Sequence, residues 1–140
     1  MLIQWNEKYS TGVDDIDDQH KEIINQLNRF HEAITSGLGK DVIIDLLEFT
    51  AQYAENHFSF EEDCMNRYRC PVAKQNEAAH RRFTKRFQEI REEIAANPVD
   101  TETVLEVYHE LKEWINWHIL KIDTNLRTCV NAEGSETAAR

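Results

Sequence analysis

The sequence contains few of the residues that interrupt regular structure, with 4 Gly and 2 Pro among 140 residues. Because both residues punctuate helices and strands, their scarcity predicts a few long elements, most readily helices. An all-β sandwich would need many more turns. No run approaches the roughly 20 apolar residues of a membrane span, and the first residues lack the regions of a signal peptide. We therefore expect a cytoplasmic protein that does not act at a membrane.

Cysteine is also scarce, with three residues at Cys64, Cys70 and Cys129. Three is an odd number, and no pair has the CxxC spacing of a zinc site. This pattern fits a reducing compartment better than a disulfide framework. We expect all three cysteines to be bystanders to the function.

Positive charge is limited: 16 Lys and Arg face 26 Asp and Glu, which gives a formal net charge of −10. A protein that binds nucleic acid neutralises phosphates with clustered Lys and Arg, so this balance excludes nucleic acid as a direct ligand. The 41% of hydrophobic residues is enough to fill the core of a single domain of this length.

Apolar residues recur at three- and four-residue steps in four segments, which is the period of helices with one buried face. The expected elements are an extended arm at residues 1–16 and helices at about 17–36, 41–68, 72–96 and 101–126. Pro71 and Pro98 end the second and third helices. Short connections force neighbouring helices to be antiparallel, so we predict an all-α, up-down-up-down four-helix bundle over residues 1–130. The small, polar residues 131–140 are expected to be a disordered tail or linker.

Five polar residues occupy positions where the helical period demands a core residue. They are His20, His57, Glu61, His80 and His118. In an antiparallel bundle with a rise of 1.5 Å per residue, all five fall within roughly 15 Å of the same end. Buried imidazole and carboxylate groups without partners would each cost several kcal/mol, so their convergence indicates a metal site. Imidazole with carboxylate suits iron, manganese or zinc.

Asp123 follows His118 by five residues, which places it about 140° further round an ideal α-helix. Periodicity alone therefore predicts a solvated side chain. Asp123 would join the cluster only if its side chain reached sideways or the helix widened into a π-type turn. The two remaining histidines, His31 and His109, are expected to be structural or exposed because they lie away from the cluster.

Several apolar residues lie within a helical turn of the cluster and could form a dry pocket beside it. They are Ile24, Phe58, Phe83, Trp114 and Ile119. Ordinary core packing predicts the same stripe, so these residues do not discriminate between the two interpretations.

The order of motifs along the chain resembles that of a bacterial hemerythrin domain over about residues 1–126. Trp5 and the run YSTGVDDIDDQH, which ends at His20, precede an HxxxE pair at His57 and Glu61 and an HxxxxD pair at His118 and Asp123. The resemblance implies an oxo- or hydroxo-bridged non-heme di-iron centre that takes O2 or a small anion as an exogenous ligand. It assigns His20 and His57 to one iron, His80 and His118 to the other, and Glu61 and Asp123 to bridging positions.

The sequence departs from this family at one position. The third helix of the family carries HxxxH, whereas here Asn76 stands four residues before His80. Asn76 could supply a weak carbonyl-oxygen ligand or leave its place to water. Alternatively, one iron keeps an open position for water, an anion or a second small ligand. Glu77, which forms an ExxH pair with His80, is a third candidate for the vacant position.

The missing imidazole leads us to expect an oxygen or redox sensor, because iron with fewer imidazole ligands should oxidise more readily. The resemblance also allows O2 storage or delivery, or a di-iron peroxidase or oxidase, although we do not expect this domain to be an enzyme. Family members occur alone and fused to signalling output domains such as diguanylate cyclases or chemoreceptors. A native chain that continues past Arg140 would favour sensing, and one that ends there would favour a carrier.

Overall fold

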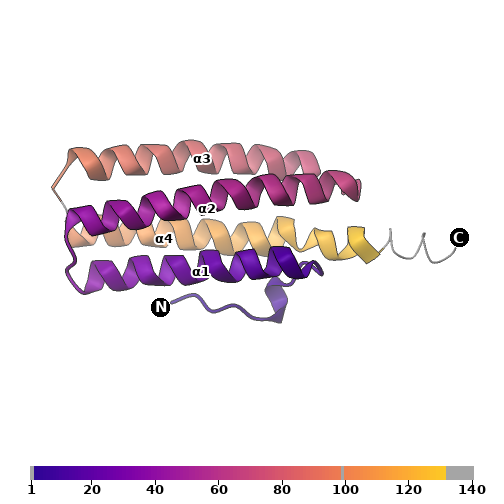
Figure 1. Cartoon of the computed structure of the whole chain (residues 1–140), viewed down its shortest axis with the longest axis horizontal. Coiled ribbons are helices and arrows are strands. Elements are labelled where there is room, and N and C mark those ends of the chain that lie inside the picture. The colour runs from indigo at the N-terminus through magenta and orange to yellow at the C-terminus, as the bar shows by residue number, and fades with distance from the viewer. Residues whose placement is uncertain (1, 99, 132–140) are drawn as a thin grey trace, which may run out of the picture.

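A computed structural model describes residues 2–98 and 100–131 and shows a bundle of four antiparallel helices (Figure 1). The helices are α1 (Asp14–Thr35), α2 (Lys40–Arg67), α3 (Ala73–Ala96) and α4 (Thr101–His118). α1 packs against α2 and α4, and α2 packs against α3. The predicted all-α, up-down-up-down bundle is confirmed. α1 begins at Asp14 rather than near residue 17, since acidic residues in its first turn complement the helix dipole.

The helix that contains α4 changes its geometry near the C-terminal end. A π-helical turn (η2, Ile119–Asp123) follows α4, and residues 125–131 are helical again. The turn is closed by a bond from the Thr124 backbone N–H to the Ile119 carbonyl, at 3.0 Å and five residues apart. The wider turn rotates Asp123 into the core, where it is 1% exposed. The surface position predicted for Asp123 from periodicity alone is therefore wrong.

Two apolar clusters fill the interior of the bundle. The larger one runs along most of its length and includes Leu27, Leu47, Ile90 and Leu111. The smaller one, which we call the end cluster, consists of Ile16, Cys64, Met65, Cys70, Ala73, Ala79, Ile122 and Leu126. On every helix, the polar residues that the sequence predicted to meet at one end lie between residues of the larger cluster and residues of the end cluster. The apolar residues on both sides keep them out of water.

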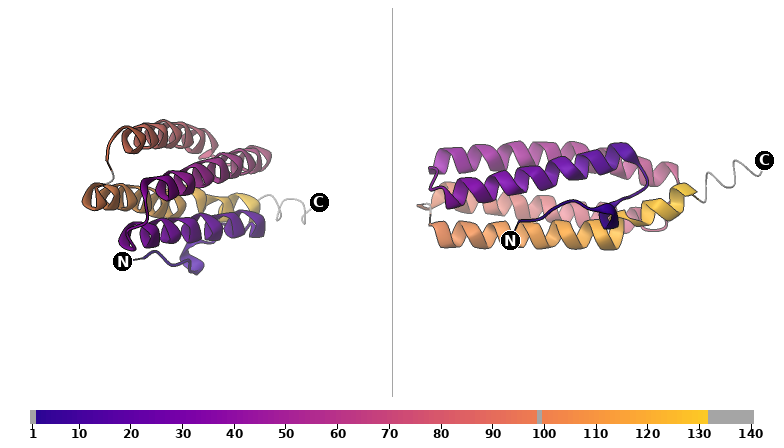
Figure 2. Two further views of the ribbon diagram at one scale, coloured as in Figure 1. Left: turned by 60° about the vertical axis from the view of Figure 1, so that its left-hand side comes forward. Right: turned by 90° about the horizontal axis from the view of Figure 1, so that it is seen from below.

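An N-terminal arm precedes α1 and lies along α1 and α4 (Figure 2). It contains a short 3-10 helix, η1 (Glu7–Tyr9). The Asn28 side chain donates to the Ile3 carbonyl at 2.9 Å, and the Tyr9 hydroxyl donates to Asn116 Oδ1 at 2.5 Å. These contacts attach the arm to both helices.

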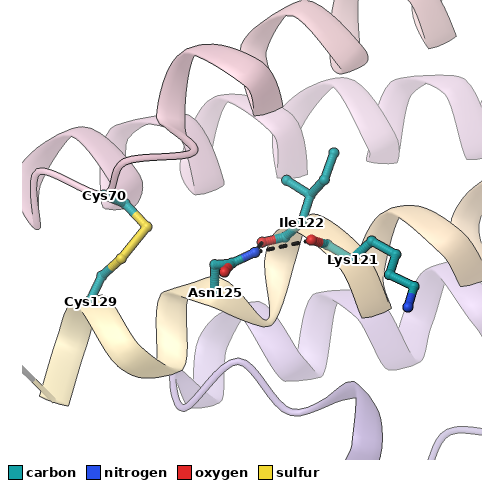
Figure 3. The surroundings of a disulfide bond; sticks show 5 residues. All are labelled: Cys70, Lys121, Ile122, Asn125 and Cys129. Carbon is teal, nitrogen blue, oxygen red and sulfur yellow. Dashed lines mark hydrogen bonds between the residues drawn. A yellow bond between two sulfur atoms is a disulfide. The ribbon is translucent and has the colours of Figure 1, made fainter.

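Two of the three cysteines form a disulfide, which neither their odd number nor their spacing predicted. Cys70, in the turn between α2 and α3, forms a disulfide with Cys129, which is 59 residues further along the chain (Figure 3). Cys64 is free and buried. The pairing is hidden in the sequence because only the antiparallel fold brings these segments to one end of the bundle. The cysteine count therefore no longer supports a reducing compartment.

Within residues 2–98 and 100–131, no helix is both long and apolar enough to cross a membrane. Of the tail or linker expected at residues 131–140, only residue 131 belongs to the part of the chain that the structure describes, and it is helical.

Candidate metal centre

The six residues assigned to metal binding form one buried layer across the bundle. α1 supplies His20, α2 supplies His57 and Glu61, α3 supplies His80, α4 supplies His118 and the π-helical turn supplies Asp123. No member is more than 3% exposed. We call this set the polar layer.

The ring nitrogens of the layer point at its two carboxylates. Glu61 Oε2 lies 3.2 Å from His20 Nε2 and 3.3 Å from His57 Nε2. Its other oxygen, Oε1, lies 3.2 Å from His80 Nε2. Asp123 divides its oxygens in the same way, with Oδ2 3.2 Å from His20 Nε2 and Oδ1 3.1 Å from His118 Nε2. Each carboxylate therefore has one oxygen that faces His20 and another that faces a histidine of α3 or α4.

This arrangement defines two groups of potential ligand atoms, and in each group the atoms lie within 4.8 Å of one another. One group is His20, His57, Glu61 and Asp123, and the other is Glu61, His80, His118 and Asp123. Ligand atoms bound to one cation at 2.0–2.2 Å lie roughly 3 Å apart, which agrees with the nitrogen–oxygen distances of the layer. The residues present therefore fit two cations that share both carboxylates.

The layer remains charged without metal. Burial lowers the pKa of His20, but its contacts with Asp123 and Glu61 outweigh burial and raise this pKa to about 10. Burial raises the pKa of Glu61, yet the neighbouring histidines hold it well below its usual value. At neutral pH these shifts favour a protonated His20 beside an ionised Glu61 when no cation is bound. Metal binding must displace this proton, because a ligating imidazole needs a free lone pair.

Two hydrogen bonds outside the layer orient its histidines. His57 Nδ1 lies 2.6 Å from Gln19 Oε1, and His80 Nδ1 lies 3.0 Å from Glu62 Oε2. When Nδ1 carries the proton for such a bond, the Nε2 lone pair faces the layer and is available to a metal. Sequence reasoning missed Gln19 and Glu62, because both bonds join different helices and depend on helix rotation.

Replacement of Glu62 by alanine is expected to weaken metal binding about 10- to 100-fold, the usual cost of losing an outer partner of a metal-ligating histidine. Isothermal titration of metal-free protein with Fe(II) under anaerobic conditions measures the change. The exposed neighbour Asp63 provides the control, since Asp63→Ala should bind as the unmodified protein does. Equal affinities for Glu62→Ala and Asp63→Ala would show that the Glu62 hydrogen bond is unimportant.

Asn76 is fully buried beside the layer. Its Nδ2 donates to Glu61 Oε1 at 3.1 Å, and its Oδ1 lies 2.8 Å from His118 Nε2. The structure does not bring Glu77 to the layer. Glu77 lies one residue further round α3, where its carboxylate accepts a bond from Asn66 on the surface.

A cavity of about 20 Å³ adjoins the histidines. Phe58, Phe83, Trp114 and Ile119 line it as expected, whereas Ile23 takes the place expected for Ile24. The cavity is close to the size of one small molecule, and its lining is mainly apolar.

The two remaining histidines lie apart from the polar layer. His31 is half-buried and packs against the Tyr108 ring, with 4.7 Å between the ring centroids. His109 is exposed. Their placement agrees with the structural or exposed positions predicted for them.

A helical bundle with histidines from all four helices around two shared carboxylates is a metal-binding bundle. The sequence matches the family described as Hemerythrin HHE cation binding domain over residues 11–129, and the chain belongs to the hemerythrin family.

Named relatives share the sequence pattern over most of their length. The chain is 30% identical to a bacteriohemerythrin of Stenotrophomonas maltophilia, over 84% of this chain and 74% of that protein. It is 29% identical to a bacteriohemerythrin of Pseudomonas aeruginosa, over 94% and 84% of the respective chains. A crystal structure of wild-type hemerythrin superposes with a TM-score of 0.80 at 24% identity, covering 92% of this chain and 98% of that one. That structure supports the fold.

Proposed function

We propose that this domain holds two iron ions and reports O2 or redox state. His20 and His57 would hold one iron, His80 and His118 the other, and Glu61 and Asp123 would be shared. Bound iron would supply O2 affinity and one-electron redox chemistry, which these side chains lack. The two overlapping groups of ligand atoms support the dinuclear part of the proposal. Their mixture of nitrogen and oxygen donors supports iron.

The observation that favours sensing is Asn76. It stands at the position of a family histidine, and it is fully buried between Glu61 and His118. An amide oxygen donates less electron density to a metal than an imidazole nitrogen does. The iron beside His80 and His118 would thus have fewer strong protein donors and a position available to water, a small anion or O2.

A domain that oxidises readily suits a switch better than a carrier, because a carrier must release O2 without losing an electron. We infer that the domain acts in the cytoplasm on a fused or separate signalling partner. A diguanylate cyclase or a chemoreceptor is the kind of output domain that such a signal would regulate. The mainly apolar cavity beside the histidines is consistent with a small neutral ligand.

The test begins with iron-loaded, fully reduced protein prepared without oxygen and then exposed to air while its absorption spectrum is followed. We expect oxidation within minutes, and a several-fold slower oxidation for Asn76→His, which restores an imidazole. Gln75→His is the matched control, since residue 75 is exposed on the same helix and should oxidise at the unmodified rate.

Each alternative function predicts a different result. An oxygenated form that persists for hours and releases O2 under vacuum would indicate a carrier. Substrate oxidation faster than that of free iron would indicate an enzyme. Equal oxidation rates for Asn76→His and the unmodified protein would show that Asn76 does not cause the rapid oxidation. Failure to bind iron would overturn the proposal.

A further inference from the structure

The disulfide lies at the end cluster, which adjoins the candidate metal centre along the bundle. It joins Cys70, which follows α2, to Cys129 in the helical segment that follows the π-helical turn (Figure 3). Cys70 is buried in the end cluster, whereas Cys129 is half-buried. A reagent in solution would therefore reach the Cys129 sulfur more easily than the Cys70 sulfur.

The segment that contains Cys129 also secures Asp123. Figure 3 shows that the Asn125 side chain donates to two backbone carbonyls of the π-helical turn, those of Lys121 at 3.0 Å and Ile122 at 2.9 Å. The Thr124 hydroxyl donates to the Leu120 carbonyl at 2.9 Å. These bonds supply donors to carbonyls around the irregular turn. The position of Asp123 therefore depends on the residues that immediately follow it.

Both shared carboxylates lie on backbone that enters the end cluster. Cys64 and Met65 follow Glu61 on α2, and Ile122 directly precedes Asp123. The disulfide joins the same two parts of the chain covalently, nine residues beyond Glu61 and six residues beyond Asp123. It limits how far the Asp123 segment can move away from the α2 end.

We propose that Cys70 and Cys129 form a reversible redox site that reacts with dithiols, and that its oxidation state sets how firmly the polar layer retains metal. The first half concerns the sulfur atoms alone. The second half rests on the proposed metal function, because it assigns Glu61 and Asp123 to the bound cations.

The exchange proceeds in two steps. One thiolate of the dithiol attacks Cys129 Sγ, the sulfur–sulfur bond breaks, and Cys70 leaves as a thiolate that takes up a proton. The second thiolate of the reagent then attacks the reagent's first sulfur, which is bonded to Cys129 in the mixed disulfide. Cys129 leaves as a thiolate that takes up a proton. In total, the protein disulfide gains two electrons and two protons, and the dithiol is oxidised to a disulfide.

In the reduced protein, only non-covalent contacts would hold the C-terminal segment against the rest of the bundle. Leu126 remains in the end cluster, and the Arg127 guanidinium donates through Nε to the Ser10 carbonyl at 3.1 Å. The segment therefore has more freedom to unwind from its end. Each opening would withdraw Asp123 from both metals, so metal loss should become faster.

The redox half is tested on metal-free, folded protein titrated with dithiothreitol. Trapping with an alkylating reagent and intact mass spectrometry should show two of three cysteines changing together, reversibly, with Cys64 unmodified until unfolding. Circular dichroism should show the bundle intact throughout. Absence of the Cys70–Cys129 bond in oxidised protein, or its resistance to dithiothreitol until the bundle unfolds, would overturn the proposal.

The metal half compares Cys129→Ser and Cys70→Ser with Cys64→Ala, which removes the third thiol and leaves the disulfide. Protein loaded with Fe(II) is mixed anaerobically with excess bipyridine, and iron loss is followed by absorption. We expect both serine variants to lose iron at least about fivefold faster, with the unmodified rate for Cys64→Ala. Dithiothreitol should accelerate loss from Cys64→Ala but not from Cys129→Ser.

These outcomes separate the two proposals. Equal rates of iron loss in all variants would overturn the link between the disulfide and the metals while leaving the proposed function intact. If the unmodified protein binds no iron, the proposed function fails and so does the metal half. The alkylation experiment still decides whether Cys70 and Cys129 form a redox site.

Discussion

Replacing Glu61 with glutamine is expected to abolish both metal sites together. Glu61 belongs to both groups of ligand atoms, with Oε2 facing His20 and His57 and Oε1 facing His80. Glutamine has nearly the same shape, but one oxygen becomes a donor and the negative charge is lost. We expect metal affinity to fall by more than about 100-fold, beyond the usual effect of losing an outer-sphere partner.

Metal analysis after anaerobic loading and gel filtration measures this effect directly. The unmodified protein should retain two equivalents of iron and Glu61→Gln less than a tenth of one. Asp63→Asn removes an exposed carboxylate two residues away and should retain two equivalents. Circular dichroism establishes that each variant is folded. Two equivalents of iron in Glu61→Gln would refute the shared role of Glu61.

The thermal transitions of the same proteins provide a second measurement. A metal that binds only the folded state raises the melting temperature by mass action. Iron should therefore stabilise Asp63→Asn and the unmodified protein but not Glu61→Gln. An equal shift in all three would mean that iron binds elsewhere.

Loss of the disulfide is expected to lower the free energy of unfolding by about 4 kcal/mol. The bond joins residues 59 positions apart, and the entropy of the unfolded chain increases when a loop of this length is opened. The loop-closure relation gives about 3 kcal/mol for 15 residues and about 4.7 kcal/mol for 100. For a domain whose total stability is typically 5–15 kcal/mol, this change is large.

Urea unfolding of the metal-free protein, with and without a phosphine reductant, measures the difference on one unchanged chain. Cys129→Ser should match the reduced protein, because Cys129 is half-buried and serine is tolerated there. Cys64→Ala should retain the stabilising effect of the bond, since Cys64 is outside it. A difference below about 1 kcal/mol between oxidised and reduced protein would contradict the prediction.

Local sequence patterns predicted the four helices and five of the six residues of the polar layer. Helix periodicity is a property of neighbouring residues, and it placed His20, His57, Glu61, His80 and His118 on faces that had to be buried. Short connections then required antiparallel neighbours, which brought these residues to one level of the bundle.

Asp123 is the residue of the polar layer that local sequence patterns did not predict. Its spacing from His118 fits no regular α-helical face, and only resemblance to a family assigned it to the metals. The π-helical turn supplies the physical reason, because its extra residue rotates Asp123 into the core. The side chains of Thr124 and Asn125 bond the carbonyls around this turn, and no periodic pattern reveals those bonds.

The sequence by itself therefore determined the class of fold, the end of the bundle where the polar residues converge and the absence of an imidazole at Asn76. Only the tertiary structure decided that both carboxylates lie within both groups of potential ligand atoms, that Gln19 and Glu62 orient histidines, and that Cys70 pairs with Cys129. The physical reason is the range of the interactions. Periodicity and chain breaks are local, whereas these pairings depend on the rotation and register of helices that are distant in sequence.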